Sequence, residues 1–204
     1  MSDAARRVAA VVLAAGASTR LGVPKQLIEF RGEPLVRRAA RAASEAGASP
    51  VIVVLGADAA NIAKALSALS SAVTVTNERW RDGLASSLAR GIREAQRLDA
   101  HCDGVLVTTA DQPLIDGPAL RRLLDAFDDG ASLVAAEYSG TIGVPAVIGR
   151  EHFEALLALE GDAGAGRWLR GKGDECVAFR WPRQQWISIL RRTPRCSPRS
   201  RAPV

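Results

Sequence analysis

The chain has 204 residues, 48% of them hydrophobic and 24% charged, which suits one globular domain and excludes a disordered or fibrous chain. Its net charge of +5 comes from the C-terminal end, where seven arginines and no acidic residue follow Phe179. The other 20 basic residues face 22 acidic ones, a balance of about −2 that argues against nucleic acid as a partner of the domain.

The chain pairs short Val, Ile and Leu runs with amphipathic stretches, the alternation of β-α-β units. In chain order, strands are predicted at 8–13, 50–55, 72–76, 103–109, 131–138, 144–148 and about 175–179, and helices at 34–46, 58–69, 83–97, 117–128, 150–159 and 163–170. Gly47 is expected to end a helix, and Asp58 and Asp116 to cap the starts of two others. We predict an α/β fold of three layers, Rossmann-like, with helices on both faces of a mostly parallel sheet.

The N-terminal run from Arg6 to Ala17 imitates a secretion signal, but the same residues fit a buried strand that runs into a glycine loop. No apolar run is long enough to cross a membrane, so we expect no membrane partner. The three cysteines, Cys102, Cys176 and Cys196, are far apart and lack zinc or disulfide spacing. That set fits a reducing compartment, and we expect a cytoplasmic protein.

The loop at residues 13–25 follows the first predicted strand and reads L-A-A-G-A-S-T-R-L-G-V-P-K. Ligands of open α/β sheets bind beyond the carboxyl ends of the strands, and small residues there let backbone N–H groups approach an anion. Arg20 offers a planar fork and Lys25 a point charge for a triphosphate. The loop is neither a Walker A nor a G-x-G-x-x-G motif, and any one of its residues taken alone fits an ordinary turn. The expected nucleotide-binding residues are Leu13, Ala14, Ala15, Gly16, Ala17, Ser18, Arg20 and Lys25.

A second candidate site follows the strand predicted at 103–109, where an apolar run ends in Asp111-Gln112-Pro113. This order places Asp111 at the same edge of the sheet as the loop. Magnesium bound to a triphosphate uses few carboxylates, together with phosphate oxygens and water. Asp111 is therefore the candidate metal ligand, although an aspartate before proline is also common in simple turns.

Together the two segments resemble the nucleotidyltransferases that build molybdenum cofactor dinucleotides, and more broadly the pyrophosphorylase-like fold of sugar-phosphate nucleotidyltransferases. Residues 13–25 match that family's L-A-A-G-x-S-x-R-x-G-x-P-K signature, and Asp111-Gln112-Pro113 matches its D-x-P motif. The resemblance implies that Arg20 and Lys25 contact the triphosphate and that Asp111 holds Mg²⁺ or Mn²⁺, which makes these three the candidate catalytic residues. Ala14-Ala15-Gly16 favours CTP, because the guanosine-transferring branch has Ala-Gly-Gly.

Two further segments extend the resemblance. Residues 77–88 resemble N-x-x-W-x-x-G-[ML]-x-S-S-L, and residues 143–165 resemble G-x-P-x-x-[FI] followed by G-D-x-G-A. In the family these segments lie near the second substrate, which implies acceptor-binding roles for Gly83, Ser86, Ser87 and Pro145. Taken alone, the two serines also fit an ordinary helix start.

The resemblance implies transfer of CMP from CTP to molybdopterin, with release of pyrophosphate. The terminal phosphate of molybdopterin would attack the α-phosphorus in line, a reaction that depends on positioning and charge neutralisation. CTP and molybdopterin are then the small-molecule partners, and a recipient molybdoenzyme is an expected protein partner. The alternatives are guanylyl transfer, transfer to a sugar or alditol phosphate, and a nucleotide-binding maturation factor for a molybdoenzyme with weak catalysis.

The C-terminal segment departs from the family, whose members continue into V-D-I-D-T-P-[EA]-D with acids that help to hold the metal. Residues 186–193 read W-I-S-I-L-R-R-T instead. We expect a nucleotidyltransferase domain at 1–179 and a basic, poorly ordered tail rich in Arg, Pro and Ser at 180–204. Two interpretations stay open: translation out of frame from near 177–180, or an authentic basic tail for an acidic partner.

The frameshift interpretation predicts the codons of the gene. If residues 186–193 are encoded TGG ATA TCG ATA CTC CGG CGG ACN after a codon ending in G, regrouping one base earlier reads Val-Asp-Ile-Asp-Thr-Pro-Ala-Asp. Resequencing the 3′ end checks this, and codons that cannot regroup contradict it. If the tail is authentic, activity is reduced by the loss of the acidic residues, and Ile187→Asp with Ile189→Asp should raise it.

Overall fold

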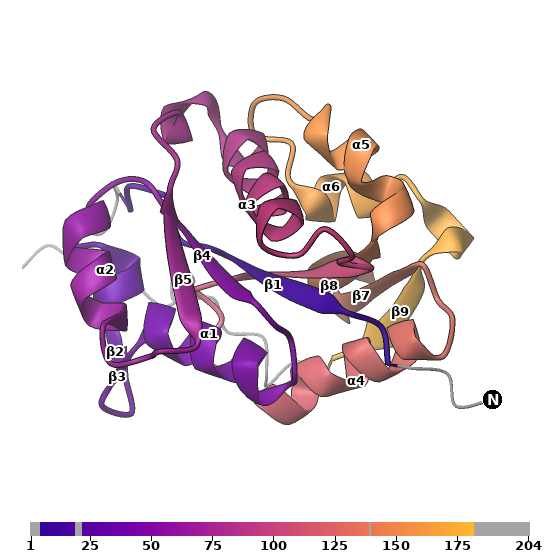
Figure 1. The fold of residues 1–204 in the computed structure, drawn as a ribbon, viewed down its shortest axis with the longest axis horizontal. Helices are drawn as coiled ribbons and strands as arrows, with labels where there is room; N and C mark the ends of the chain where they lie inside the picture. Colours follow the sequence, from indigo (N-terminus) through magenta and orange to yellow (C-terminus); the bar gives the residue numbers. More distant parts are fainter. Residues whose placement is uncertain (1–4, 19–21, 139, 182–204) are drawn as a thin grey trace, which may run out of the picture.

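The computed structural model describes residues 5–18, 22–138 and 140–181, and its centre is a seven-stranded sheet (Figure 1). The strand order is β5-β4-β1-β6-β8-β7-β9, and only β8 runs against its neighbours. The predicted α/β fold with a mostly parallel sheet is confirmed. The strands are β1 (Val8–Leu13), β4 (Val51–Leu55), β5 (Ala72–Thr76), β6 (Gly104–Thr109), β7 (Leu133–Tyr138), β8 (Thr141–Gly149) and β9 (Val177–Arg180).

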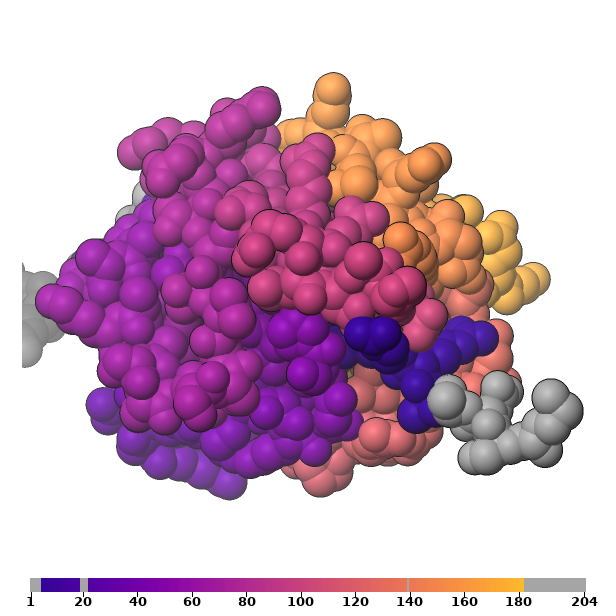
Figure 2. Space-filling view, in the orientation of Figure 1, coloured from indigo at the N-terminus to yellow at the C-terminus, as the bar shows by residue number. Residues whose placement is uncertain are grey.

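Helices cover both faces of the sheet. One face packs against α1 (Leu35–Glu45), α2 (Ala59–Leu66) and α4 (Gly117–Asp128), and the other against α3 (Leu84–Leu98), α5 (Phe153–Leu157) and α6 (Ala165–Arg170). Alternate residues of β1 contribute to the two cores, because successive side chains of a strand point to opposite faces. All six residues of β1 are buried, and in Figure 2 the darkest indigo, near the N-terminus, shows mainly as a small patch right of and below the centre.

The predicted elements are all present, with bounds that agree within three residues. The structure adds a short antiparallel pair, β2 (Glu29–Phe30) and β3 (Glu33–Pro34), which is too short to give a periodic sequence pattern. The strand predicted at 144–148 extends in both directions, because β8 continues past an irregularity opposite Ala135 and Ala136. The helix predicted at 150–159 begins as a 3₁₀ turn, Arg150–His152, which leaves only five residues for α5.

All three predicted helix boundaries are confirmed, but only one of the two predicted side-chain caps forms. Gly47 follows α1 with φ of 97°, and the side chain of Asp116 accepts a hydrogen bond of 3.0 Å from the backbone N–H of Ala119. Helix α2 begins after Asp58 as predicted, but the predicted side-chain cap was wrong. Asp58 takes a left-handed conformation with φ of 57°, and its carboxylate accepts from the Asn61 side chain instead of a backbone N–H.

The described chain ends at the carboxyl edge of the sheet. Strand β9 pairs in parallel with β7, and the Trp181 N–H donates to the Glu137 carbonyl at 3.0 Å. The sheet thus runs past residue 179, the expected domain boundary, while residues 182–204 lie outside the described part. No helix of the described residues combines the length and the apolar character that a membrane crossing needs.

Candidate active site

The loop after β1 is held from beneath by Gln26, a fully buried side chain. Its amide Nε2 donates to the carbonyls of Ala14 and Gly16 at 2.8 and 2.7 Å, and its Oε1 accepts from the Ser18 hydroxyl at 3.3 Å. The Ser18 hydroxyl in turn accepts from the backbone N–H of Lys25 at 2.9 Å. One amide side chain therefore connects the beginning and the end of the described loop.

The loop after β6 meets the loop after β1 through an ion pair. The Lys25 ammonium lies 3.0 Å from Oδ2 of Asp111, and the Thr109 hydroxyl donates to Oδ1 at 2.7 Å. The two charged side chains are largely shielded, with exposures of 24% and 16%. The pair forms because β1 and β6 are adjacent parallel strands, with Leu13 opposite Thr109.

The Asp111 carboxylate is held in its charged form. Burial raises the pKa of Asp111, but the charge of Lys25 and the hydrogen bonds from Thr109 and Lys25 outweigh it, so the pKa lies below its ordinary value. The ion pair therefore stabilises the fold at neutral pH, and its contribution is lost as the pH falls through that lowered pKa.

The first hollow at this edge of the sheet has a volume of about 670 Å³. Residues of the loop, among them Ala15, Gly16 and Lys25, line one side, and Gly83 and Ser87 at the start of α3 line another. Leu13, Ala17 and Asp111 complete the predicted residues that it brings together.

Two predicted loop residues are placed differently. Ala14 is buried beneath the loop, where its carbonyl accepts a hydrogen bond from Gln26, and the Ser18 hydroxyl donates to Gln26. Both support the loop without lining the hollow. Arg20 lies outside the described residues.

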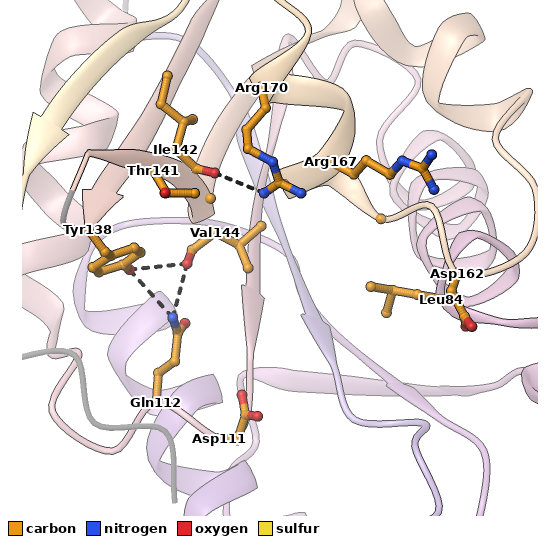
Figure 3. A pocket seen from close by; sticks show the side chains of 13 residues that line it. Leu84, Asp111, Gln112, Tyr138, Thr141, Ile142, Val144, Asp162, Arg167 and Arg170 are labelled. Carbon is orange, nitrogen blue, oxygen red and sulfur yellow. Dashed lines mark hydrogen bonds between the residues drawn. The ribbon is translucent and has the colours of Figure 1, made fainter. Parts of the chain in front are cut away.

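A second hollow of about 610 Å³ adjoins the first and extends toward α6 (Figure 3). The two hollows share Leu84, Asp111 and Asp162 in their walls. One wall is fixed by the Val144 carbonyl, which accepts from Nε2 of Gln112 at 3.0 Å and from the Tyr138 hydroxyl at 3.1 Å.

The predicted acceptor residues do not gather in this second hollow. Gly83 and Ser87 line the first hollow only, and Pro145 is buried behind Val144, to which a cis peptide bond joins it. Ser86 lines a different hollow on the outer side of α3, and its hydroxyl lies 2.8 Å from the Gly83 carbonyl. Ser86 thus supports the helix start.

The loop that carries Asp162 packs closely against the start of α3. Gly83 has φ of 105°, and a Cβ there would lie 2.3 Å from backbone atoms of Gly161. The backbone N–H of Ala85 donates to the Gly161 carbonyl at 3.0 Å. Only glycine permits this approach, which places Asp162 at the junction of the hollows.

The donor set fits a metal that arrives with its own oxygen ligands. Within the described part of the chain, no cluster of three or more His, Cys, Asp or Glu side chains could hold a metal ion. Magnesium is commonly bound by one or two carboxylates with substrate phosphates and water completing its shell. Asp111 fits that role beside a triphosphate.

Several residues of the site were missed by the sequence analysis. Gln26 and Gln112 stand next to recognised motif residues, but glutamine has no charge or spacing that marks it as a loop brace. Tyr138 was hidden inside a predicted strand. Arg167 and Arg170 were detectable in principle, since their spacing of three puts them on one face of the helix predicted at 163–170.

Comparison with known proteins identifies a family and several relatives that match most of the chain. Residues 10–177 match the family described as MobA-like NTP transferase domain. Nicotine blue oxidoreductase of Paenarthrobacter nicotinovorans is 35% identical over 81% of this chain and 82% of its own length.

Solved structures with the same fold include a nucleotidyl transferase from Methanothermobacter thermautotroptrophicus (Mth528), with TM-score 0.75, 25% identity, and coverage of 90% of this chain and 91% of that one. Rv0371c from Mycobacterium tuberculosis H37Rv has TM-score 0.72 and 30% identity, covering 87% and 89%. In its complex with manganese, the same protein has TM-score 0.66 and 27% identity, covering 86% and 88%.

Replacing Lys25 with methionine separates the two partners of Asp111. We expect Lys25→Met to bind free Mn²⁺ more tightly than the wild type, because no ammonium competes for the carboxylate. The same variant should bind a nucleoside triphosphate about tenfold more weakly, the loss of about 1.4 kcal/mol that one charge-assisted contact contributes. Electron paramagnetic resonance of free Mn²⁺ and calorimetry measure the two effects. Lys64→Met, at an exposed lysine of α2, is the control, and equal Mn²⁺ binding by all three proteins contradicts the expectation.

Replacing Gln26 with leucine tests the brace beneath the loop. The variant keeps a side chain of similar size but leaves the Ala14 and Gly16 carbonyls without their donor. We expect the free energy of unfolding to fall by about 1–3 kcal/mol, measured by urea denaturation, and triphosphate binding to weaken. Gln96→Leu, at a half-buried position of α3, should change neither. A Gln26→Leu protein with wild-type stability and affinity would show that the brace is dispensable.

Proposed function

This chain belongs to the MobA-like NTP transferase domain family, and we propose from that premise that it transfers CMP from CTP to molybdopterin and releases pyrophosphate. Nucleotidyl transfer itself accords with the family and with the structural neighbours. The observation that carries the proposal is the junction of two adjoining hollows at Asp111, with the Lys25 ion pair at that junction.

The first hollow suits the nucleotide. The small residues Ala15, Gly16 and Ala17 leave backbone N–H groups open to a triphosphate, and Lys25 adds positive charge beside them. We assign Gly83 and Ser87 to the nucleotide as well, since they lie across this hollow from the loop. Asn77 donates to the Ser87 hydroxyl at 3.0 Å, which leaves the hydroxyl proton available to a base or a ribose. Preference for CTP rests on Ala14-Ala15-Gly16.

The second hollow suits the acceptor, because it opens from the same carboxylate. A divalent ion, Mg²⁺ or Mn²⁺, would be held by Asp111 and would neutralise the triphosphate at the attacked phosphorus. Thr109 and Lys25 keep that carboxylate ionised and oriented. The attacking phosphate is already anionic at neutral pH, so these residues need only position charges and move no proton.

The wider setting follows from the same proposal. A cytoplasmic location and delivery of the product to a molybdoenzyme remain part of it. Cys102 and Cys176 are free and buried, and burial raises the pKa of both thiols, which fits unreactive core residues.

A second candidate function comes from the relative named as an oxidoreductase, which matches most of this chain. A redox reaction on a nucleotide-containing cofactor would use the same two hollows. Under that alternative, a reduced nicotinamide cofactor would be oxidised by passing a hydride to an oxidised organic acceptor, and no pyrophosphate would be released.

The decisive measurement is pyrophosphate release with molybdopterin and Mg²⁺, comparing CTP, GTP and UTP. We expect the rate with CTP to exceed the others at least about tenfold, a difference of about 1.4 kcal/mol in transition-state binding. Asp111→Asn should lower it about 100-fold, as typical for loss of one charge-stabilising group. Asp129→Asn, at an exposed acid after α4, is the matched control.

Each other outcome identifies an alternative. Release with GTP indicates guanylyl transfer, and release only with sugar or alditol phosphates indicates a different acceptor. Nucleotide binding without pyrophosphate release with any acceptor points to a maturation factor. Oxidation of a reduced nicotinamide cofactor points to an oxidoreductase.

A further inference from the structure

Two arginines of α6 project into the second hollow. Ala165 and Leu169 bury one side of α6 in the core, while Arg167 and Arg170 share another side, three residues apart. Helix α6 lies close against β8, since a Cβ on Gly166 would be 3.4 Å from the Cα of Gly143. In Figure 3 both guanidinium groups extend from α6 over the hollow. Packing of α6 therefore sets where these two side chains start, while both of them are exposed.

Neither arginine is neutralised by an acid of the described chain. Among the residues described, no carboxylate forms an ion pair with Arg167 or Arg170. Arg170 donates one N–H to the Ile142 carbonyl at 3.2 Å, a contact that orients its guanidinium without cancelling its charge. Many other arginines of the chain do pair with acids, as Arg41 does with Glu33 and Arg97 with Glu94. A guanidinium has five N–H donors, so most of the donors of Arg167 and Arg170 remain available.

The two arginines and Asp111 lie at opposite ends of the hollow. Asp111 and Gln112 stand at one end and the arginines at the other, with the wall formed by Tyr138 and Val144 between them, and Asp162 lines another side. A volume of about 610 Å³ accommodates a ligand of several rings. A ligand that reaches from end to end would place one group beside Asp111 and another beside the arginines.

We propose that Arg167 and Arg170 bind a second anionic group of the acceptor, remote from the phosphate that attacks the nucleotide. The placement of the attacking phosphate near Asp111 rests on the function proposed above. The fork of an arginine matches an oxyanion or a pair of anionic sulfur or oxygen atoms. In molybdopterin this group is the dithiolene, either bare or carrying an oxo-metal centre, and in another acceptor it is a phosphate or carboxylate.

The first arm of the test uses inorganic phosphate, a probe that does not depend on the acceptor. With the nucleotide hollow saturated by CTP, calorimetry should show phosphate binding that falls at least fivefold in the Arg167→Met, Arg170→Met double variant. Arg93→Met, at an exposed arginine of α3 without an ion pair among the described residues, should bind as the wild type does. Arg170→Lys keeps the charge but loses the fork, and its phosphate affinity should lie between those of the wild type and the double variant. Equal phosphate binding by the wild type and the double variant overturns the proposal.

The second arm measures pyrophosphate release with metal-free and metal-loaded molybdopterin. The double variant should raise the KM for the acceptor about tenfold or more, while the thermal shift produced by CTP stays unchanged. A raised KM with both acceptors assigns the arginines to the thiolates, and a raised KM with the loaded form alone assigns them to the oxo-metal centre. An unchanged KM with both overturns the proposal. Absence of release by the wild type, with normal phosphate binding, contradicts the proposed function alone.

Discussion

The contact between Lys25 and Asp111 joins two loops that are 86 residues apart in sequence but follow adjacent strands. Each partner depends on a different support: Gln26 holds the loop that carries Lys25, and Thr109 fixes the carboxylate of Asp111. Because both charges are shielded from water, their attraction is stronger than it would be on the surface. The two hollows meet at this pair, so the geometry of the site follows from the pairing of β1 with β6.

The opening of the second hollow depends on close backbone approaches. Gly83 lets the loop around Gly161 lie against the start of α3, where a Cβ would come within 2.3 Å of backbone atoms. Any larger residue at Gly83 would push the Asp162 loop away from α3, whereas a Cβ on Gly166 would meet β8 at 3.4 Å, an ordinary packing distance. One side of the second hollow therefore depends on the glycine at the start of α3.

Much of the fold was predictable, because buried parallel strands and amphipathic helices have recognisable patterns in the sequence. Residues such as Asp116 mark where those patterns begin. The loop and Asp111 were predictable because they follow such strands directly. The division between the hollows was not, since Gly83 and Ser87 belong to one helix start whose orientation depends on tertiary packing. Asp58 shows the same limit: its side chain suits a cap, but the backbone adopts a left-handed turn that directs it elsewhere. Gln26 acts through carbonyls that no sequence pattern reveals.

The shared wall of the two hollows has a consequence for the end of the proposed reaction. A product that joins nucleotide and acceptor would occupy both hollows as one molecule, so its two halves would hold each other in place at high effective concentration. Leaving would require both sets of contacts to break together, whereas each substrate enters by making only one. In the proposed reaction, dissociation of the joined product, rather than bond formation, would then limit the rate of turnover, and a recipient protein that loosens either half would speed it.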